Sequence, residues 1–384
     1  MNGLDNLRLA LHPRVLELII FPTEKCNFRC TYCYEDFELG KMKRPVIEGI
    51  KNLINARIER NTLEALTLSW FGGEPTLAAD VVLELSGYGR SLLEAGRLRQ
   101  FSGGLTTNGY LLRETLLRQL VACRQTSYQI SLDGYGDGHD QTRKYASGKG
   151  TFDVIWANLL AAQKTDLQFE ILLRLHQTDS NGDSMQQLVD AIEQNFSGDT
   201  RFSVFFKSIE NLGGANAASI KKVDVDRVGT RVRKLSAQLR ERGFRVTAVL
   251  DGPESSRGDS DDVPDAVNDS SFGPPSGNET SAPKGYGGYI CYAAKPNSLI
   301  IRSDGRVGKC TVMLNDDRNM VGRLHPDGSL SLDDARLKLW MRGFSSFDPI
   351  EMGCPAQTLP ALPPAANHEV PLLKLSDLRA SVAP

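Results

Sequence analysis

The stretch Cys26-Asn27-Phe28-Arg29-Cys30-Thr31-Tyr32-Cys33 decides how the rest of this protein is interpreted. Its three cysteines, at CxxxCxxC spacing, come soon after an apolar run, residues 15–21, that is typical of a buried strand. Three thiolates on one short loop can bind three irons of a [4Fe–4S] cluster, which leaves the fourth iron open to a small molecule. The alternatives are a disulfide and a zinc knuckle, but no histidine in the loop offers zinc a fourth ligand. We therefore expect an iron–sulfur site at the end of this strand, where barrel active sites gather.

Composition narrows the class of protein. The chain has 384 residues, 40% of them hydrophobic and 24% charged, which is ordinary for a globular protein of one large domain or two. A net charge of −2 gives no electrostatic reason to expect nucleic acid or an anionic membrane as a partner. No apolar run approaches the roughly 20 residues of a membrane span, and residues 1–13 lack the apolar region of a signal peptide. We expect a cytoplasmic protein.

Strand-like and helix-like segments alternate from Val15 to about Ser208. The predicted strands are 15–22, 65–71, 101–107, 127–132, 167–175 and 202–206. The predicted helices between them are 45–60, 79–95, 113–123, 152–164 and 185–195. Regular alternation of this kind predicts parallel strands joined by crossover helices. Six such units indicate an α/β fold with an open, partial barrel.

A second motif, Trp70-Phe71-Gly72-Gly73-Glu74-Pro75, ends the second predicted strand. Two glycines at a strand end let the backbone approach a ligand closely, because no Cβ intervenes. A Gly-Gly pair by itself also fits an ordinary turn.

Polar side chains follow the third and fourth predicted strands. Asn108 lies in Thr106-Thr107-Asn108-Gly109, and Ser131 and Asp133 lie in Ser131-Leu132-Asp133-Gly134. Hydroxyl, amide and carboxylate groups at such a rim can bind a ribose or a carboxylate. Asn-Gly and Asp-Gly also read as turn residues that merely start loops.

Two arginines are candidates for binding an anion. Arg143 ends His139-Asp140-Gln141-Thr142-Arg143 and offers a planar fork to a carboxylate, although it also fits a surface position before the turn at 148–150. Arg174 lies within an apolar strand, where a charge is rarely buried unpaired, so we expect it to point into the barrel mouth.

The cysteine motif, with an aromatic residue before its last cysteine, resembles the signature of the radical S-adenosylmethionine (SAM) superfamily. The Gly-Gly-Glu-Pro, TTNG, SLDG and HDxxR segments resemble those of the same family. The resemblance implies a partial (β/α)6 barrel. In that family, SAM binds the open iron and is cleaved to methionine and a 5′-deoxyadenosyl radical, which abstracts a hydrogen atom from the substrate. The resemblance makes Cys26, Cys30 and Cys33 the cluster ligands. Residues implied to lie at SAM or the substrate are Tyr32, near the adenine, with Gly72, Gly73, Glu74, Asn108, Ser131, Asp133, Arg143 and Arg174.

A second set of cysteines, Cys291, Cys310 and Cys354, lies near the end of the sequence. Ser303-Asp304-Gly305 predicts a hairpin turn between residues 298–302 and 306–310. This region resembles the C-terminal extension called SPASM, or its shorter form called twitch, which holds auxiliary [4Fe–4S] clusters. A full SPASM carries about seven cysteines, so three support one auxiliary iron–sulfur cluster with a fourth ligand from elsewhere. A degenerate extension without metal is the alternative. Cys123 is expected to be a core thiol.

These patterns predict five segments. Residues 1–14 are an N-terminal segment, 15–215 the radical SAM barrel, and 216–250 a bridging helical region. Residues 251–286, rich in Asp, Ser, Pro and Gly, are expected to be a disordered linker or a lid. Residues 287–384 form the small iron–sulfur extension.

The motifs most resemble those of peptide maturases. We therefore expect a radical SAM oxidoreductase that abstracts a hydrogen from a residue of a ribosomally made precursor peptide. The expected product is a carbon–carbon cross-link between side chains, of the cyclophane type. The expected partners are that peptide and a one-electron reductant of the flavodoxin or ferredoxin type. The leader of the peptide is expected to bind the barrel, the extension or a separate leader-binding protein.

Three alternatives remain. They are an anaerobic sulfatase-maturing (formylglycine-forming) enzyme, a twitch-type dehydrogenase of a small alcohol, and a non-catalytic electron carrier. Sulfatase-maturing enzymes place an aspartate base after the hairpin cysteine, where this sequence has Thr311. No catalytic base can be assigned.

Overall fold

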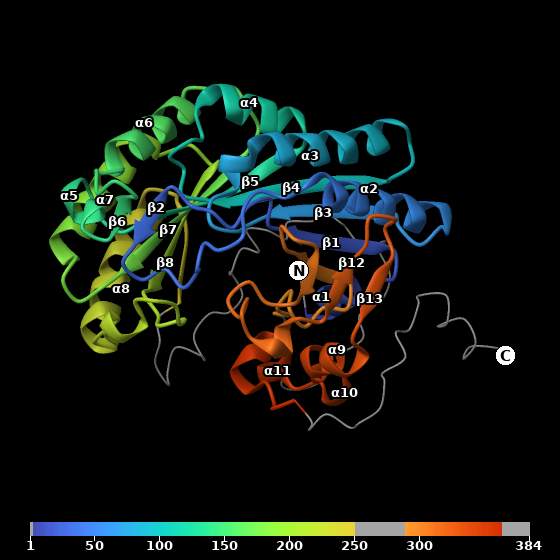
Figure 1. Ribbon diagram of the computed structural model, residues 1–384. Coiled ribbons are helices and arrows are strands. Elements are labelled where there is room, and N and C mark those ends of the chain that lie inside the picture. The colour runs from blue at the N-terminus through green and yellow to red at the C-terminus, as the bar shows by residue number, and fades with distance from the viewer. Residues whose placement is uncertain (1–2, 250–288, 363–384) are drawn as a thin grey trace.

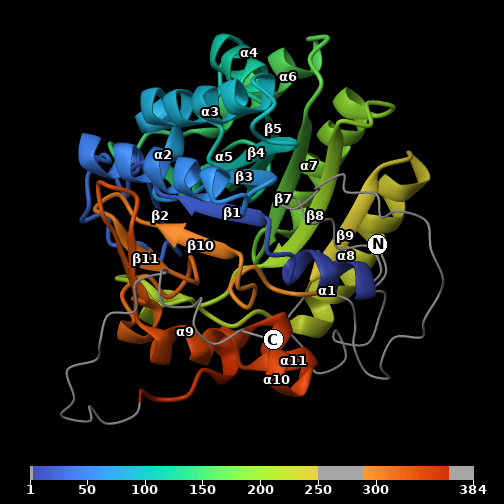
Figure 2. The ribbon, with the colours of Figure 1, turned by 90° about the vertical axis from the view of Figure 1, so that its right-hand side faces the viewer.

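A computed structural model describes residues 3–249 and 289–362 of the protein. Its main feature is an 11-stranded sheet with the order β13-β12-β11-β10-β1-β3-β4-β5-β7-β8-β9 (Figures 1 and 2). The six predicted barrel strands are present as β1 (Val15–Ile20), β3 (Ala65–Trp70), β4 (Gln100–Thr107), β5 (Gln125–Leu132), β7 (Glu170–Gln177) and β8 (Phe202–Ser208). Each is parallel to the next, which confirms the predicted α/β class and partial barrel.

The crossover helices cover one face of this sheet (Figure 2). They are α2 (Arg44–Glu59), α3 (Ala79–Glu94), α4 (Glu114–Ala122), α6 (Phe152–Gln163) and α7 (Gly182–Phe196). Pro45 lies in the first turn of α2, where its missing N–H costs no hydrogen bond. Successive strand residues point to opposite faces, so Leu173 and Leu175 are buried on one face while Arg174 and His176 lie on the other.

The sheet extends beyond the predicted strands at both edges. Helix α8 (Val225–Glu241) leads into β9 (Arg245–Val249), which is parallel to β8. Only Val246 of this strand is buried, and the strand was not among the predicted ones. At the other edge, β10 (Ser298–Ile301) adds to β1 in parallel. The C-terminal residues therefore continue the barrel sheet.

Three short antiparallel strands complete that edge: β11 (Arg306–Gly308), β12 (Gly322–Leu324) and β13 (Leu330–Leu332). The β10–β11 pair is the predicted hairpin, with Gly305 at φ +86° in its turn. Helices α9 (Asp334–Met341), α10 (Gly343–Ser346) and α11 (Pro349–Gly353) lie below these strands in Figure 1. The N-terminal helix α1 (Gly3–Ala10) packs there too, with Ala10 against Ile290 and Ala294.

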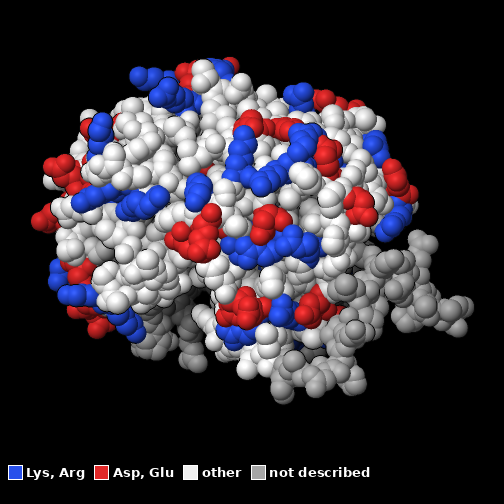
Figure 3. All heavy atoms as spheres, in the orientation of Figure 1, with Lys and Arg blue, Asp and Glu red and all other residues white. Residues whose placement is uncertain are grey.

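A two-stranded sheet and a short helix stand apart from the main sheet. Strand β2 (Phe28–Cys30) pairs with β6 (Arg143–Tyr145), and α5 (Asp137–Asp140) precedes β6. Residues 251–286, predicted as a linker or lid, lie outside the described residues. No helix within 3–249 and 289–362 is long and apolar enough to cross a membrane. Basic and acidic side chains are interspersed on the face that Figure 3 presents.

Candidate radical site

The three-cysteine loop, residues 24–36, contains β2, which pairs with β6. In the β2–β6 pair Cys30 lies opposite Arg143, so a segment more than a hundred residues away in sequence places a guanidinium beside a thiol. The loop is folded tightly, because the Phe28 amide donates to the Cys26 sulfur at 3.3 Å. The Cys33 amide donates to the Cys30 carbonyl at 3.2 Å.

Burial changes the acidity of these thiols. It raises the pKa of Cys26 and Cys30, and it raises the pKa of Cys33 to about 12. Thiols in such surroundings stay protonated unless a cation binds them. Among the described residues, no three His, Cys, Asp or Glu side chains are gathered around a point for a single metal ion. A donor set of three separated thiols fits a cluster that is held at three corners.

The two glycines of the second motif bring β3 against the entry to this loop. A Cβ on Gly72 would lie 2.3 Å from the Thr23 carbonyl oxygen, and one on Gly73 would lie 2.5 Å from that of Lys25. Gly72 also has a φ of +113°, which side chains rarely adopt. Glycine is therefore required at both positions to let the segment before Cys26 pass.

Glu74 is a structural tie between strands. Its carboxylate is fully buried and accepts hydrogen bonds from the Thr76 amide (2.9 Å), the Thr76 hydroxyl (2.6 Å) and the Thr107 hydroxyl (2.7 Å). It also accepts the Asn108 amide at 2.7 Å. These four bonds join the ends of β3 and β4 and occupy both carboxylate oxygens.

Tyr32 belongs to a buried polar network at the ends of β5 and β7. Its hydroxyl lies 3.0 Å from Asp133 Oδ1 and 2.9 Å from His176 Nδ1, and it accepts from Arg143 Nη1 at 2.7 Å. Thr142 donates to the other Asp133 oxygen at 2.6 Å. Burial opposes ionisation of Asp133, but the His176 hydrogen bond and the Arg143 charge outweigh it, so the pKa of Asp133 lies well below its usual range. The carboxylate is ionised and fixed in place.

The remaining predicted residues lie at the same end of the sheet. Asn108 Nδ2 donates to Asn27 Oδ1 at 2.8 Å and lies 4.0 Å from the Cys26 sulfur. Ser131 is in register with Arg174 on neighbouring strands. The structure therefore brings every residue predicted for SAM or substrate to the carboxyl ends of β3, β4, β5 and β7 and to the two-stranded sheet.

Buried polar atoms without a partner in the described protein mark this region. Those in this region include Arg143 Nε, Arg174 Nε and Asn27 Nδ2. Among the described residues, the Arg174 guanidinium has only a long hydrogen-bond contact, 3.5 Å, to Gln129, and it lies 5.9 Å from the centre of the Phe205 ring. Because unsatisfied buried donors are costly, they fit a bound polar molecule that offers acceptor oxygens, as the carboxylate and the ribose of SAM would.

Sequence reasoning missed three residues of this site: Asn27, Thr142 and His176. His176 follows Arg174 by two positions on β7, and this spacing, which places both on one face, was the available signal. Nothing in the sequence indicates that its ring reaches Tyr32 and Asp133, since that contact depends on how three segments meet.

The late cysteines also come together. Cys291 and Cys354 lie on adjacent segments, with the Cys291 amide donating to the Met352 carbonyl at 2.9 Å, and Cys310 follows β11. Burial and the charges of Cys310 and Cys354 raise the pKa of Cys291 to about 12, and burial with the charge of Cys354 raises the pKa of Cys310. All seven cysteines of the protein are free thiols.

Comparison with known proteins gives the class to which this site belongs. Residues 20–189 match the model of the Radical SAM superfamily. The match covers the cysteine loop, the glycine motif and both candidate arginines, and it confirms the predicted class of enzyme.

Curated relatives are similar over part of their length only. The protein is 28% identical over 169 residues to the "Cysteine-type anaerobic sulfatase-maturating enzyme" of Clostridium novyi, which is 41% of this protein and 43% of that one. It is 32% identical over 121 residues to the "GTP 3',8-cyclase" of Rhizobium meliloti, which is 31% of this protein and 33% of that one. The protein therefore spans less than half the length of these relatives.

Solved structures share the fold over most of the sequence. One is anSMEcpe with bound AdoMet and the Kp18Cys peptide, with a TM-score of 0.57, 21% identity and coverage of 84% of this protein and 80% of that one. Another is SuiB of Streptococcus suis bound to the precursor peptide SuiA, with a TM-score of 0.56, 16% identity and coverage of 90% and 70%. At this identity the likeness concerns the fold.

Proposed function

We propose that this protein is a radical SAM peptide maturase that cross-links side chains of a ribosomally made precursor peptide. The observation that carries this proposal is the convergence at one sheet end of three half-buried cysteines and two guanidiniums whose Nε atoms have no partner among the described residues. The cluster and SAM, when bound, supply a 5′-deoxyadenosyl radical on arrival of one electron from a flavodoxin- or ferredoxin-type donor.

The protein's own residues have distinct roles in this proposal. Cys26, Cys30 and Cys33 hold the cluster, and the backbone at Gly72 and Gly73 lies against SAM's amino group. Because both Glu74 oxygens are taken by protein donors, Glu74 acts by fixing that backbone. Arg143 and Arg174 bind carboxylates.

Two further features support a peptide substrate. The fold neighbours include proteins solved with bound peptides, one of them a precursor peptide. The thiols of Cys291, Cys310 and Cys354 converge beyond the barrel edge, where an auxiliary iron–sulfur cluster could accept the electron lost when the cross-link forms.

A sulfatase-maturing activity is the second candidate, because a curated relative over 169 residues carries that name. The position after Cys310 argues against it. Thr311 occupies it, and its hydroxyl is 2.8 Å from the Tyr292 hydroxyl, so neither a carboxylate nor a free base is present there.

Anaerobic reconstitution with iron and sulfide tests the core of the proposal. With SAM and dithionite, the protein is expected to release 5′-deoxyadenosine, Cys30→Ala is expected to release none, and Cys123→Ala serves as the matched cysteine control. Incubation with candidate precursor peptides is expected to give a mass loss of two hydrogens, whereas a formylglycine product would favour the second candidate. Cleavage retained in Cys30→Ala would contradict the ligand assignment.

A further inference from the structure

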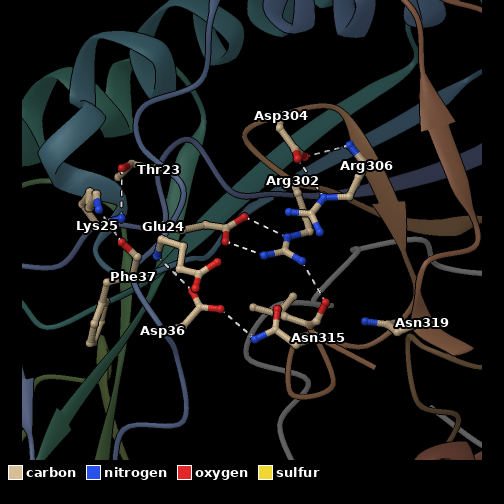
Figure 4. Close-up of polar contacts among 12 residues, drawn as sticks. Thr23, Glu24, Lys25, Asp36, Phe37, Arg302, Asp304, Arg306, Asn315 and Asn319 are labelled. Carbon is tan, nitrogen blue, oxygen red and sulfur yellow. Dashed lines mark hydrogen bonds and ion pairs between the residues drawn. The ribbon is translucent and has the colours of Figure 1, made fainter. Parts of the chain in front are cut away.

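The C-terminal extension reaches back to the three-cysteine loop through one arginine (Figure 4). Strand β10 pairs with β1, and the Phe21 amide continues the pairing by donating to the Ile301 carbonyl at 2.9 Å. Just past the ends of both strands, Arg302 donates Nε to Glu24 Oε1 at 2.9 Å and Nη2 to Glu24 Oε2 at 2.6 Å. Side-chain exposure is only 6% for Arg302 and 2% for Glu24, so this two-pronged ion pair is buried.

Glu24 stands at the entry to the loop, two residues before Cys26, and a second contact holds the exit. Arg302 Nη1 donates to the Leu314 carbonyl at 2.8 Å. The next residue, Asn315, donates Nδ2 to Asp36 Oδ2 at 2.7 Å, as Figure 4 shows. Arg302 and the turn that it binds therefore contact the three-cysteine loop both before its first cysteine and after its last.

The charges around Arg302 show what it offsets. The Glu35 carboxyl is buried near Glu24 and Asp36, and its Oε2 has no hydrogen-bond partner in the described protein. The positive charge of Arg302 favours the ionised form of Glu35. It also contributes to the lowered pKa of Asp36, although the hydrogen bonds that the Asp36 carboxylate accepts contribute more. Without the guanidinium, three acidic side chains of one short segment would face one another.

A buried ion pair is a weak source of net stability, because desolvation of both charges cancels most of their attraction. The planar guanidinium of Arg302 nevertheless fixes the geometry of the pair, since two parallel hydrogen bonds allow one relative orientation of guanidinium and carboxylate. A lysine cannot reproduce that fork.

We propose that Arg302 is a positioning residue through which the C-terminal extension sets the conformation of the three-cysteine loop, residues 24–36. The pair with Glu24 fixes the backbone before Cys26, and the Leu314–Asn315 turn fixes the backbone after Cys33. The extension thereby holds the three thiols in the arrangement that binds the cluster. This inference rests on the proposed function only in taking those thiols as cluster ligands.

Thiol reactivity in the reduced, metal-free protein tests it directly. The rates at which iodoacetamide alkylates Cys26, Cys30 and Cys33 are measured by peptide mass spectrometry, with Cys123 as the internal reference. Arg302→Met is expected to speed labelling of the loop cysteines by about tenfold or more, because a local opening becomes more populated, while labelling of Cys123 stays unchanged. Arg302→Lys is expected to fall between Arg302→Met and the wild type, because it keeps the charge and loses the fork.

A double variant separates positioning from stability. Arg302→Met alone leaves the buried Glu24 charge unpaired and lowers stability, whereas Glu24→Gln with Arg302→Met removes both charges and is expected to recover most of it. Labelling of the loop cysteines is expected to stay fast in the double variant. Its iron content after reconstitution, and the change that SAM causes in the electron paramagnetic resonance spectrum of the reduced protein, are expected to stay reduced.

Arg201 and Asp199 provide the matched control. Their guanidinium and carboxylate also form a two-pronged pair, with Arg201 Nη1 bound to the Thr165 and Leu167 carbonyls, far from the loop. Arg201→Met with Asp199→Asn is expected to leave loop labelling at the wild-type rate.

Wild-type labelling rates in Arg302→Met and in the double variant would overturn the proposal, as would equal acceleration by the control pair. Because labelling needs neither cluster nor SAM, a wild-type protein that fails to cleave SAM would refute the proposed function and leave this measurement intact.

Discussion

The Glu74 carboxylate accepts the backbone N–H of Asn108 at 2.7 Å and so ties the end of β3 to the end of β4. Its other oxygen accepts three more hydrogen bonds, from Thr76 and Thr107. A carboxylate that accepts four hydrogen bonds from the protein holds the ends of both strands in place, and in the proposed site the glycine backbone before it is the part that faces SAM.

Glu74→Gln is expected to destabilise the metal-free protein. The amide replaces an acceptor by a donor, which then meets either the Asn108 N–H or the threonine donors, and an unmet buried donor costs about 1–3 kcal/mol. Urea unfolding measures the loss. Glu64→Gln, at a partly exposed surface pair with Arg14, is the control and is expected to leave the free energy of unfolding close to the wild-type value. Equal stability of Glu74→Gln and the wild type would speak against the four bonds.

Gly73→Ala is expected to lower iron binding after reconstitution to a small fraction of the wild-type value. The new Cβ would lie 2.5 Å from the Lys25 carbonyl oxygen and 2.6 Å from that of Glu24, so the segment before Cys26 must shift. Gly87→Ala is the matched control, since nothing lies within 4 Å of a Cβ there. Gly87 is inside α3, where alanine is expected to add about 0.5–1 kcal/mol of stability. Iron content after reconstitution and urea unfolding are measured for both variants, and equal iron content in Gly73→Ala and Gly87→Ala would contradict the prediction.

His139 makes stability depend on pH. Burial lowers its pKa from 6.5 to about 4. Between these values the unfolded state takes up a proton that the folded state does not, so the free energy of unfolding falls as pH is lowered, by about 3 kcal/mol in total at 1.36 kcal/mol per unit. His139→Asn is expected to flatten this decline. Burial lowers the pKa of His176 as well, so part of the slope remains. An unchanged slope between pH 7 and pH 4.5 would contradict the prediction.

Arg174→Met is expected to move stability and binding in opposite directions. Burial and the Arg143 charge lower the pKa of Arg174, as is usual for a buried cation that lacks a carboxylate partner, and removing that charge is expected to stabilise the metal-free protein by on the order of 1 kcal/mol. Binding of SAM to the reconstituted protein, or the peptide KM if the arginine binds a substrate carboxylate, is expected to worsen about tenfold or more. Loss of stability would mean that the guanidinium already has its partner within the protein.

Cys310→Ala is expected to leave SAM cleavage intact and to abolish the cross-linked product. The reason is that Cys310 lies with Cys291 and Cys354 in the extension and outside the three-cysteine loop. Chromatography of 5′-deoxyadenosine and mass spectrometry of the peptide follow the two outcomes separately. Full product from Cys310→Ala would remove the case for a role of the extension cysteines in turnover.

The local sequence was sufficient for much of this fold. Six strand-like segments with intervening helical periodicity predicted the parallel strands β1, β3, β4, β5, β7 and β8, because the strand face that the crossover helices cover must be apolar. The cysteine spacing and the glycine motif identified the loops at their carboxyl ends. The hairpin of β10 and β11 was visible in its turn residues.

The sequence alone determined which chemical groups this protein carries and the order in which they follow the strands, since spacing and periodicity are local properties. Only the tertiary structure decided that Glu74 accepts hydrogen bonds from the protein and that His176 contacts Tyr32. It also decided that Arg302 binds Glu24, which is 278 positions away in the sequence. The partners in these pairs come from segments far apart in the sequence, and they meet because parallel strands bring their ends to one edge of the sheet and β10 adds itself beside β1.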